Sequence, residues 1–462
     1  MLTAEYFPAC KLLFPVDTQP HKLAHLTPDP APQQPPLAPA RTGAKRFAID
    51  LTPLKISREF RLLFISQSVS YFGSMASFVV LPWQMYQLTK SSFAVGMLGA
   101  TEFLPIITMA FIGGALADYT DRRRMVRLAE LLAVLAAAAL VINSVLAHPK
   151  VWVLFVCAGS FAALSGLKRP SLEALKPRLV PAELQPAIAA LGSMGGSVGS
   201  IVGPALGGFI AGTAGPTVAY LLTLSMFALS LITLWLMRAT PPPSAAERPG
   251  LRSIMEGLRY AISRKELMGT YLIDMNAMFF GMPMALFPAI AERFGHASVG
   301  FLYAAPSMGA LLATLSSGWT ARVNRHGLAV TIAAGLWGVA IIFFGFAGTL
   351  WLGIFWLIVA GAADMVSGIF RMTIWNQTIP DHLRGRLAGI EMVSYMSGPL
   401  LGNAEAGIVA SLFSIRTSVV SGGILCVAGT ALLAMTLPSF LRYDGRQGIL
   451  RKRMEERARS TV

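Results

Sequence analysis

Twelve long apolar runs are the feature of this sequence that most restricts its fold. The chain has 462 residues, of which 54% are hydrophobic and 13% are charged, whereas soluble domains carry about a quarter charged residues. A run of about 20 apolar residues can span a bilayer, and alternating ten-residue strands would instead indicate a membrane β-barrel. We therefore expect an all-α membrane protein. The predicted segments are residues 60–86, 92–117, 125–147, 151–168, 185–212, 217–238, 267–291, 297–320, 328–348, 351–375, 384–410 and 417–441.

The positive charges are distributed unevenly between the two sides of these segments. Only four of the 38 lysines and arginines, Lys90, Lys150, Arg293 and Arg416, lie in odd-numbered connections. Almost all of the others lie in the tails and the even-numbered connections. Because basic loops stay in the cytoplasm, this asymmetry predicts cytoplasmic termini. The net charge of +15 is then a signal of topology, and we expect no nucleic-acid partner.

The longest connection divides the segments into six and six. It opens with the linker-like sequence PPPSAAERPG, and Leu251, Ile254, Leu258 and Ile262 then recur at helical spacing. This spacing predicts an amphipathic helix on the membrane surface. The predicted organisation is a disordered cytoplasmic tail (1–57), an N-terminal six-helix bundle (58–238), a cytoplasmic linker (239–266), a C-terminal six-helix bundle (267–441) and a basic cytoplasmic tail (442–462).

The two halves carry related motifs at equivalent places. Gly114–Asp118 after segment 2 corresponds to Gly318–Arg322 after segment 8, and Gly199–Gly207 in segment 5 corresponds to Ser394–Gly402 in segment 11. Like positions in like-oriented halves predict a parallel repeat about an axis along the membrane normal. In transporters built this way, the substrate lies between two bundles near the midplane.

The connection between segments 2 and 3 contains the sequence GGALADYTDRRR. A carboxylate at a membrane boundary is costly unless it has a partner, so we expect Asp118 and the neighbouring arginines to form a cytoplasmic latch. The alternative is a basic loop needed only for membrane insertion. The predicted gating residues are Gly114, Asp118, Asp121, Arg122, Arg123 and Arg124.

Segment 5 carries a ridge of glycines with a proline inside it. Glycines allow a neighbouring helix to approach closely, and proline favours a kink. The ridge is either a sliding interface between the bundles or a site of static close packing. The residues concerned are Gly199, Gly203, Pro204, Gly207 and Gly208.

These motifs resemble those of the major facilitator superfamily over residues 58–441. The loop of Gly114–Arg124 is similar to its loop 2–3 signature, with Asp121 where a glycine is usual, and segment 5 resembles its antiporter signature. Residues 251–260 and 300–310 resemble the branch of enterobactin (siderophore) exporters and multidrug-efflux proteins. The resemblance implies two six-helix bundles, rocker-switch alternating access, a cavity lined by segments 1, 4, 7 and 10, and segment 11 as the partner of Asp118.

Acidic residues inside the segments are the candidates for proton coupling or substrate contact, because buried charges in membranes are costly and often functional. Each could instead make a structural hydrogen bond or ion pair. Arg371 follows Asp364 by seven residues on one helix face, a rise of about 10 Å that predicts no direct pairing. We also expect Glu130 to pair with nearby arginines. The candidates are Glu102, Asp274, Asp364, Arg371, Glu391 and Glu405.

Several other classes of protein are disfavoured by the sequence. It contains no Walker A motif, its histidines lie at segment ends, and its acids are scattered singly, so we expect no enzyme, metal, cofactor or ATPase subunit. The predicted function is export of small amphipathic molecules, with siderophore-type or drug cargo, by proton antiport. The alternative is an importer or uniporter of a small metabolite. We expect a monomer in the lipid of the inner cell membrane.

Overall fold

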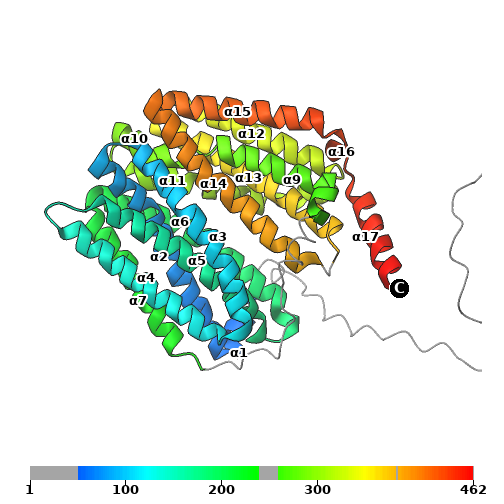
Figure 1. Ribbon diagram of the computed structural model, residues 1–462, viewed down its shortest axis with the longest axis horizontal. Coiled ribbons are helices and arrows are strands. Elements are labelled where there is room, and N and C mark those ends of the chain that lie inside the picture. The colour runs from blue at the N-terminus through cyan, green and yellow to red at the C-terminus, as the bar shows by residue number, and fades with distance from the viewer. Residues whose placement is uncertain (1–49, 239–258, 381–382, 461–462) are drawn as a thin grey trace, which may run out of the picture. The chain divides into compact units, whose positions relative to one another are not determined.

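The computed structural model describes residues 50–238, 259–380 and 383–460, and every named element in these ranges is a helix (Figure 1). Eleven spans in the described residues are long and apolar enough to cross a membrane. The 29-residue helix α14 (Arg384–Leu412) occupies the place of the remaining predicted segment. The structure thus confirms the all-α membrane fold expected from the apolar runs.

The N-terminal bundle consists of the six long helices that precede the linker. A short helix, α1, precedes them and lies within the predicted tail of residues 1–57. The elements are α1 (Thr52–Ile56), α2 (Arg58–Thr89), α3 (Ser92–Tyr119), α4 (Arg122–Val145), α5 (Val151–Leu175), η2 (Lys176–Arg178), η3 (Ala182–Leu184), α6 (Gln185–Thr213) and α7 (Pro216–Trp235).

The C-terminal bundle follows the linker, and a further helix, α17, covers most of the predicted basic tail. The elements are α9 (Lys265–Phe280), η4 (Met284–Leu286), α10 (Phe287–Phe294), α11 (Ser298–Leu315), η5 (Ser317–Arg322), α12 (His326–Gly345), α13 (Leu350–Thr378), α14 (Arg384–Leu412), α15 (Ile415–Thr436), α16 (Pro438–Leu441) and α17 (Gly445–Ser460). Most of the predicted linker helix, residues 251–258, lies outside the described residues, and residues 259–263 are helical.

Short polar side chains fix the starts of several membrane helices. Each accepts a hydrogen bond from a backbone N–H in the first turn, which would otherwise lack a partner. The sequence places them in the connections, directly before an apolar run. These N-caps are Ser57, Ser91, Asp121, Thr349 and Ser414.

The seventh predicted segment is broken where the sequence predicted one helix over 267–291. Helix α9 ends at Phe280, and η4 and α10 follow Pro283, which cannot donate to a helix ladder. The indole Nε1 of Trp337 donates to the carbonyl of Gly281 at 3.0 Å, and Asn403 accepts from the N–H of Ala285 at 3.0 Å. These side chains satisfy backbone groups that the break releases, as irregular backbone at membrane depth requires.

The two bundles touch closely at one end, which we call the tight end. It is the end that carries the connections α2–α3, α6–α7, α10–α11 and α14–α15. A Cβ added to Gly208 of α6 would lie 2.4 Å from Gly300 of α11, and one added to Gly96 of α3 would lie 3.0 Å from Gly407 of α14. The helix pairs α6–α11 and α3–α14 are therefore in backbone contact there.

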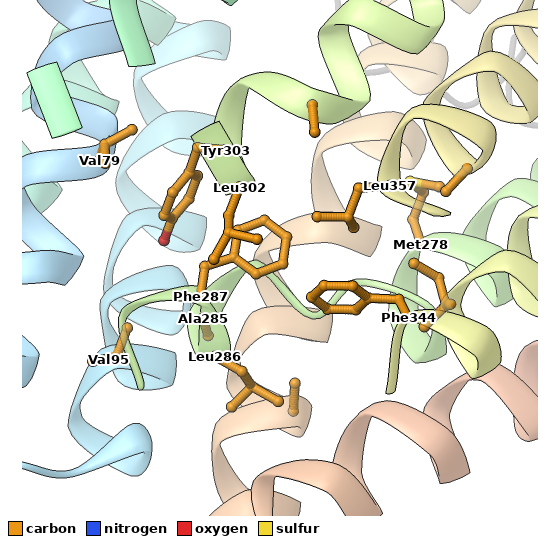
Figure 2. Packing of buried hydrophobic residues seen from close by; sticks show 14 of the residues in the cluster. Val79, Val95, Met278, Ala285, Leu286, Phe287, Leu302, Tyr303, Phe344 and Leu357 are labelled. Carbon is orange, nitrogen blue, oxygen red and sulfur yellow. The ribbon is translucent and has the colours of Figure 1, made fainter. Parts of the chain in front are cut away.

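Buried apolar side chains from both bundles fill the tight end. Figure 2 shows Tyr303 lying between Val79 of the N-terminal bundle and Phe287 of the C-terminal bundle. The ring of Tyr303 meets those of Phe287 and Phe78 edge-on, with centroids 5.0 Å and 5.6 Å apart. Edge-to-face aromatic pairs add about 0.5–1.5 kcal/mol beyond burial of their area, so this cluster stabilises the contact between the bundles.

Candidate transport pathway and gates

Three of the predicted charged candidates come together in one cluster inside the C-terminal bundle. Arg371 of α13 pairs through Nη1 with Oδ1 of Asp274 on α9, and its Nη2 lies 3.5 Å from Oδ1 of Asp364. The side chains of Arg371 and Asp274 are 11% and 8% exposed, whereas that of Asp364 is 41% exposed. The cluster therefore has one buried carboxylate, one accessible carboxylate and a single cation between them.

The prediction that Arg371 could not reach Asp364 was wrong. It counted only the rise of the backbone between the two residues. Side chains on a helix lean toward its N-terminus, and Arg371 follows Asp364, so its long side chain extends back along the helix face. Its guanidinium carries five donors, which lets it contact two carboxylates at once. The Nε of Arg371 is buried with no hydrogen-bond partner among the described residues.

Glu102 lies apart from this cluster, at the interface between the bundles. It lines a small cavity of about 50 Å³ together with Phe78 of α2, Tyr303 of α11 and Asn403 of α14. A cavity of this size can hold a single water molecule. Among the described residues, no hydrogen bond or ion pair involves its carboxylate. The small cavity that it lines lies near the tight end.

The remaining two acidic candidates, both on α14, do not join the cluster. Glu391 lies near Tyr271 of α9, whose ring packs against Trp375 at a centroid distance of 5.9 Å. Glu405 is partly buried and makes no hydrogen bond or ion pair with other described residues. The structure thus brings together Asp274, Asp364 and Arg371 and leaves the three glutamates separate.

The N-terminal bundle holds a buried ion pair that the sequence did not reveal. The Nζ of Lys168 on α5 lies 3.2 Å from Oε2 of Glu130 on α4 and 3.1 Å from the hydroxyl of Ser70 on α2. Glu130 is fully buried. It was predicted to pair with arginines at the end of its own segment, which is wrong, because α5 continues to Leu175 and brings Lys168 inside the bundle. The predicted segment had ended at residue 168.

Arg169 and Arg371 occupy equivalent places in the two halves. Gly159 of α5 faces Pro105 of α3, and Gly361 of α13 faces Pro306 of α11. Each arginine lies ten residues after the glycine of its helix. This repeat, anchored on a glycine and the proline it faces, was a signal in the sequence that could have identified Arg169.

Arg169 makes a contact between the two bundles. Its Nη1 donates to the hydroxyl of Tyr395 on α14, and its guanidinium lies 5.5 Å from the centre of that ring. Arg371 instead pairs with acids of its own bundle. The two equivalent arginines therefore serve different contacts.

A charged pair closes the outer rim of the tight end. Lys90, the left-handed C-cap of α2, forms an ion pair with Glu292 of α10. Gln87 donates to the same carboxylate at 3.5 Å. One layer deeper, Trp83 of α2 meets His296 with ring centroids 5.1 Å apart. These contacts join α2 to α10 and to the connection that follows it, so the rim and the aromatic layer must separate together if this end opens.

The predicted latch region is more helical than expected. Gly114 and Asp118 lie in the last turns of α3, and only Thr120 and Asp121 link α3 to α4. Asp121 caps α4 by accepting from the N–H of Arg123 at 3.0 Å. The side chain of Asp118 and its predicted contact with segment 11 lie outside the described residues.

The described arginines of this region contact their own bundle. Arg122 donates to the carbonyl of Ala174 on α5 at 3.2 Å, Arg124 lies 3.7 Å from Asp121, and Arg123 is buried. These contacts hold the connection in place, whereas a role in gating stays a prediction.

The glycines of α6 face two different partners. Cβ atoms added to Gly199, Gly203 and Gly207 would meet Tyr71, Met75 and Ala76 of α2, in the same bundle, at 2.5–2.7 Å. Gly208, together with the carbonyls of Pro204 and Ala205, meets Gly300 of α11 in the opposite bundle, and Gly212 meets His296 just before α11. Most of the ridge is therefore packing within the N-terminal bundle, and the contact between bundles is confined to its end.

The chain is similar to known secretion proteins over most of its length. A family model described as transmembrane secretion effector (MFS_3) matches residues 48–456. The chain is 27% identical over 391 residues to the enterobactin exporter EntS of Shigella boydii serotype 18, covering 83% of this chain and 93% of that protein. The same protein of Escherichia coli O1:K1 / APEC gives the same identity and coverage.

Solved transporter structures share the fold at low sequence identity. A POT family transporter in complex with 5-aminolevulinic acid has a TM-score of 0.66 at 14% identity and covers 83% of this chain and 97% of its own. A bacterial homologue of the iron transporter ferroportin, in an inward-facing state, has a TM-score of 0.64 at 14% identity, covering 83% and 98%. The chain belongs to the transmembrane secretion effector family and is a multi-pass membrane transporter of the major facilitator superfamily.

Proposed function

We propose that this protein exports small amphipathic molecules across the cell membrane in exchange for protons, by alternating access of a path between its two bundles. The observation that carries the proposal is the cluster of Asp274, Arg371 and Asp364, in which two carboxylates share one buried cation. The proton gradient is its energy source, and no cofactor or ATPase subunit takes part.

The cluster is suited to coupling because its charge depends on a single proton. With both carboxylates ionised it carries one net negative charge, and one bound proton makes it neutral. Asp364 is the accessible member, so it is the residue that exchanges protons. An ionised group is costly in a low-dielectric environment. Protonation of Asp364 therefore lowers the cost of enclosing the cluster when the bundles change their orientation.

The arrangement of the two ends supports loading of cargo from the cytoplasm. In the topology predicted by the positive charges, both termini lie in the cytoplasm, and the tight end faces the opposite side of the membrane. The described state is then closed outside and receives cargo from inside. Arg169 and Tyr395 already join the bundles toward the other end, and the loop of Asp118 is the latch that completes closure there.

The favoured cargo is a siderophore or an amphipathic drug. Support comes from the relatives named as enterobactin exporters, which match along most of the chain. A monomer suffices for this mechanism, because each chain contains both bundles and the path between them.

The test is efflux from proteoliposomes loaded with enterobactin or with a macrolide. Release that depends on an opposing pH gradient, and that Asp364→Asn abolishes, supports proton antiport. Glu183→Gln, at an exposed position of η3, is the matched control and should transport normally. Release that ignores the pH gradient, or equal uptake in the opposite direction, would identify an importer or uniporter and overturn the proposal.

A further inference from the structure

A cluster of arginines lies on the surface of the N-terminal bundle, at the end opposite the tight end. Arg58, at the beginning of α2, donates to the carbonyl of Leu236, just after α7, at 3.3 Å. The N–H of Arg238 donates to Glu59 of α2 at 2.9 Å. Arg123, at the beginning of α4, lies near the same glutamate. The ends of α2, α4 and α7 therefore bring their charges together in one place.

Positive charge exceeds negative charge among the described side chains of this cluster. Glu59 is shared between Arg58 and the backbone of Arg238, and Asp121 lies 3.7 Å from Arg124. The Nε atoms of Arg123 and Arg127 have no hydrogen-bond partner in the described part of the chain. The acids thus neutralise only part of the cluster. Its arginines are Arg58, Arg123, Arg124, Arg127 and Arg238, and its acids are Glu59 and Asp121.

One of these arginines contacts an exposed indole on the neighbouring helix. Helices α4 and α7 lie side by side (Figure 1). The guanidinium of the half-buried Arg127 lies over the ring of Trp235, 5.1 Å from its centre, and Trp235 is 63% exposed. Tryptophans at the ends of membrane helices lie at the level of the lipid headgroups. The contact therefore holds a guanidinium, which binds phosphate through several donors, at the depth of the headgroups.

Exposed apolar side chains continue from this point toward the tight end. On α4 the exposed Arg124 is followed by Leu128, Leu131 and Leu135, which are also exposed. Residues at this spacing lie on one face of a helix. On α7, Ile232 is exposed one turn before the indole. A surface for hydrocarbon chains thus begins where the arginines end.

We infer that this edge of α4 and α7 binds an anionic phospholipid, with its phosphate at Arg124 and Arg127 and its acyl chains along the leucines of α4. Charge complementarity favours it over a zwitterionic lipid, which would bring a further cation to a surface with excess positive charge. The adjoining apolar face favours it over a soluble anion, which would leave that face unused. The inference does not depend on the direction or the coupling of transport.

The indole of Trp235 can itself report which lipid lies beside it, because brominated acyl chains quench the fluorescence of nearby tryptophans. The full-length protein would be placed in nanodiscs containing equal amounts of phosphatidylglycerol and phosphatidylcholine, with bromine on one lipid or on the other. The chain has eight tryptophans, so the contribution of Trp235 is the difference between the native chain and Trp235→Phe. We expect phosphatidylglycerol to occupy the site roughly fivefold more often. Equal quenching by the two lipids would overturn the inference.

Three variants and a matched control test the role of the arginines. The double variant Arg124→Gln, Arg127→Gln should abolish the preference, whereas Arg127→Lys keeps the charge and should retain most of it. Arg124→Gln alone changes a side chain that is 85% exposed, so it should fold normally and lower the preference about twofold. Arg416→Gln is the control, because Arg416 lies over the ring of Phe346 at 4.7 Å but belongs to α15, near the tight end.

Each outcome of this comparison decides for or against the site. A native preference in the control, together with its loss in the double variant, supports the inference. A preference that survives in both glutamine variants would overturn it. Inorganic phosphate, added at constant ionic strength, distinguishes the two sources of the anion. A lipid that is also held by its chains should stay bound, and displacement by phosphate would overturn the inference and identify a site for a soluble anion.

Discussion

The Nη2 of Arg371 lies 3.5 Å from Oδ1 of Asp364, two helical turns earlier on α13, while its Nη1 contacts Asp274 on α9. One guanidinium thus connects two helices and two carboxylates of unequal exposure. A change at Asp364, the accessible residue, alters the electrostatic balance at Asp274, which water reaches poorly. The contact between α9 and α13 is therefore linked to the protonation of a single side chain.

The first prediction concerns the buried half of this cluster. Arg371→Gln leaves Asp274 buried without its cation, which should lower the free energy of unfolding by about 3–5 kcal/mol. Adding Asp274→Asn should restore most of this loss, because the buried position then carries no charge, and the Asp364 carboxylate that has also lost its cation is 41% exposed. The thermal unfolding midpoint in detergent measures both effects. A double variant as unstable as the single one would show that the ion pair does not account for the loss. Transport should stay impaired in the double variant.

The second prediction separates the two kinds of glycine contact in α6. Gly203→Leu should destabilise the N-terminal bundle, because its side chain would collide with Met75 and the backbone of α2. Gly208→Ala instead meets Gly300 of the other bundle, so it should weaken closure of the tight end while each bundle stays folded. Expression and thermal stability report the first effect, and transport rate reports the second. Normal stability of Gly203→Leu would contradict the assigned packing.

The third prediction concerns the rim of the tight end. Lys90→Glu places two carboxylates together and should shift the population toward the open rim. The shift should be no more than about fivefold, since exposed pairs contribute about 0–1 kcal/mol. Spin labels at Leu88 and Arg293 would report the separation of α2 and α10. Adding Glu292→Lys reverses the pair and should restore the native distance, whereas persistent opening would rule out the ion pair as a rim contact.

The fourth prediction concerns the latch proposed at the other end. Asp118→Asn should insert and fold normally but transport more slowly, because a neutral side chain holds the closed state less tightly. Efflux rate, measured at matched expression, tests this expectation. Asp121→Ala is a useful comparison, since it removes the side chain that caps α4 and should lower stability instead, by about 0.5–2 kcal/mol. A native rate for Asp118→Asn would leave the loop as an insertion signal only.

Much of the fold could be predicted from the sequence because membrane helices depend on the length and apolarity of local runs. The break in the seventh segment was missed, although Gly281 and Pro283 are visible in the sequence, because the hydropathy of the run continues across it. The structure shows what makes the break possible. The side chains of Trp337 and Asn403, distant in sequence, form hydrogen bonds with the backbone groups that the break releases.

The residues of the candidate site could be identified from the sequence, whereas most of the contacts between them could not. Asp274, Asp364 and Arg371 were identified because charges stand out in apolar runs. Their meeting depends on the direction of a long side chain and on the packing of α9 against α13, which sequence spacing does not specify. Lys168 was missed because the segment was ended too early, and its contact with Glu130 requires knowing that α4 lies beside α5.

The backbone contact between Gly208 and Gly300 has a consequence for how the two bundles part. No side chain from either glycine interlocks across this junction, so the helices can roll or slip on one another without first unthreading bulky groups. Rigid bodies that turn about such a bare surface need little local rearrangement. The α6–α11 junction can therefore serve as a pivot between the bundles. The aromatic contacts and the ion pair around it must separate before the bundles rotate.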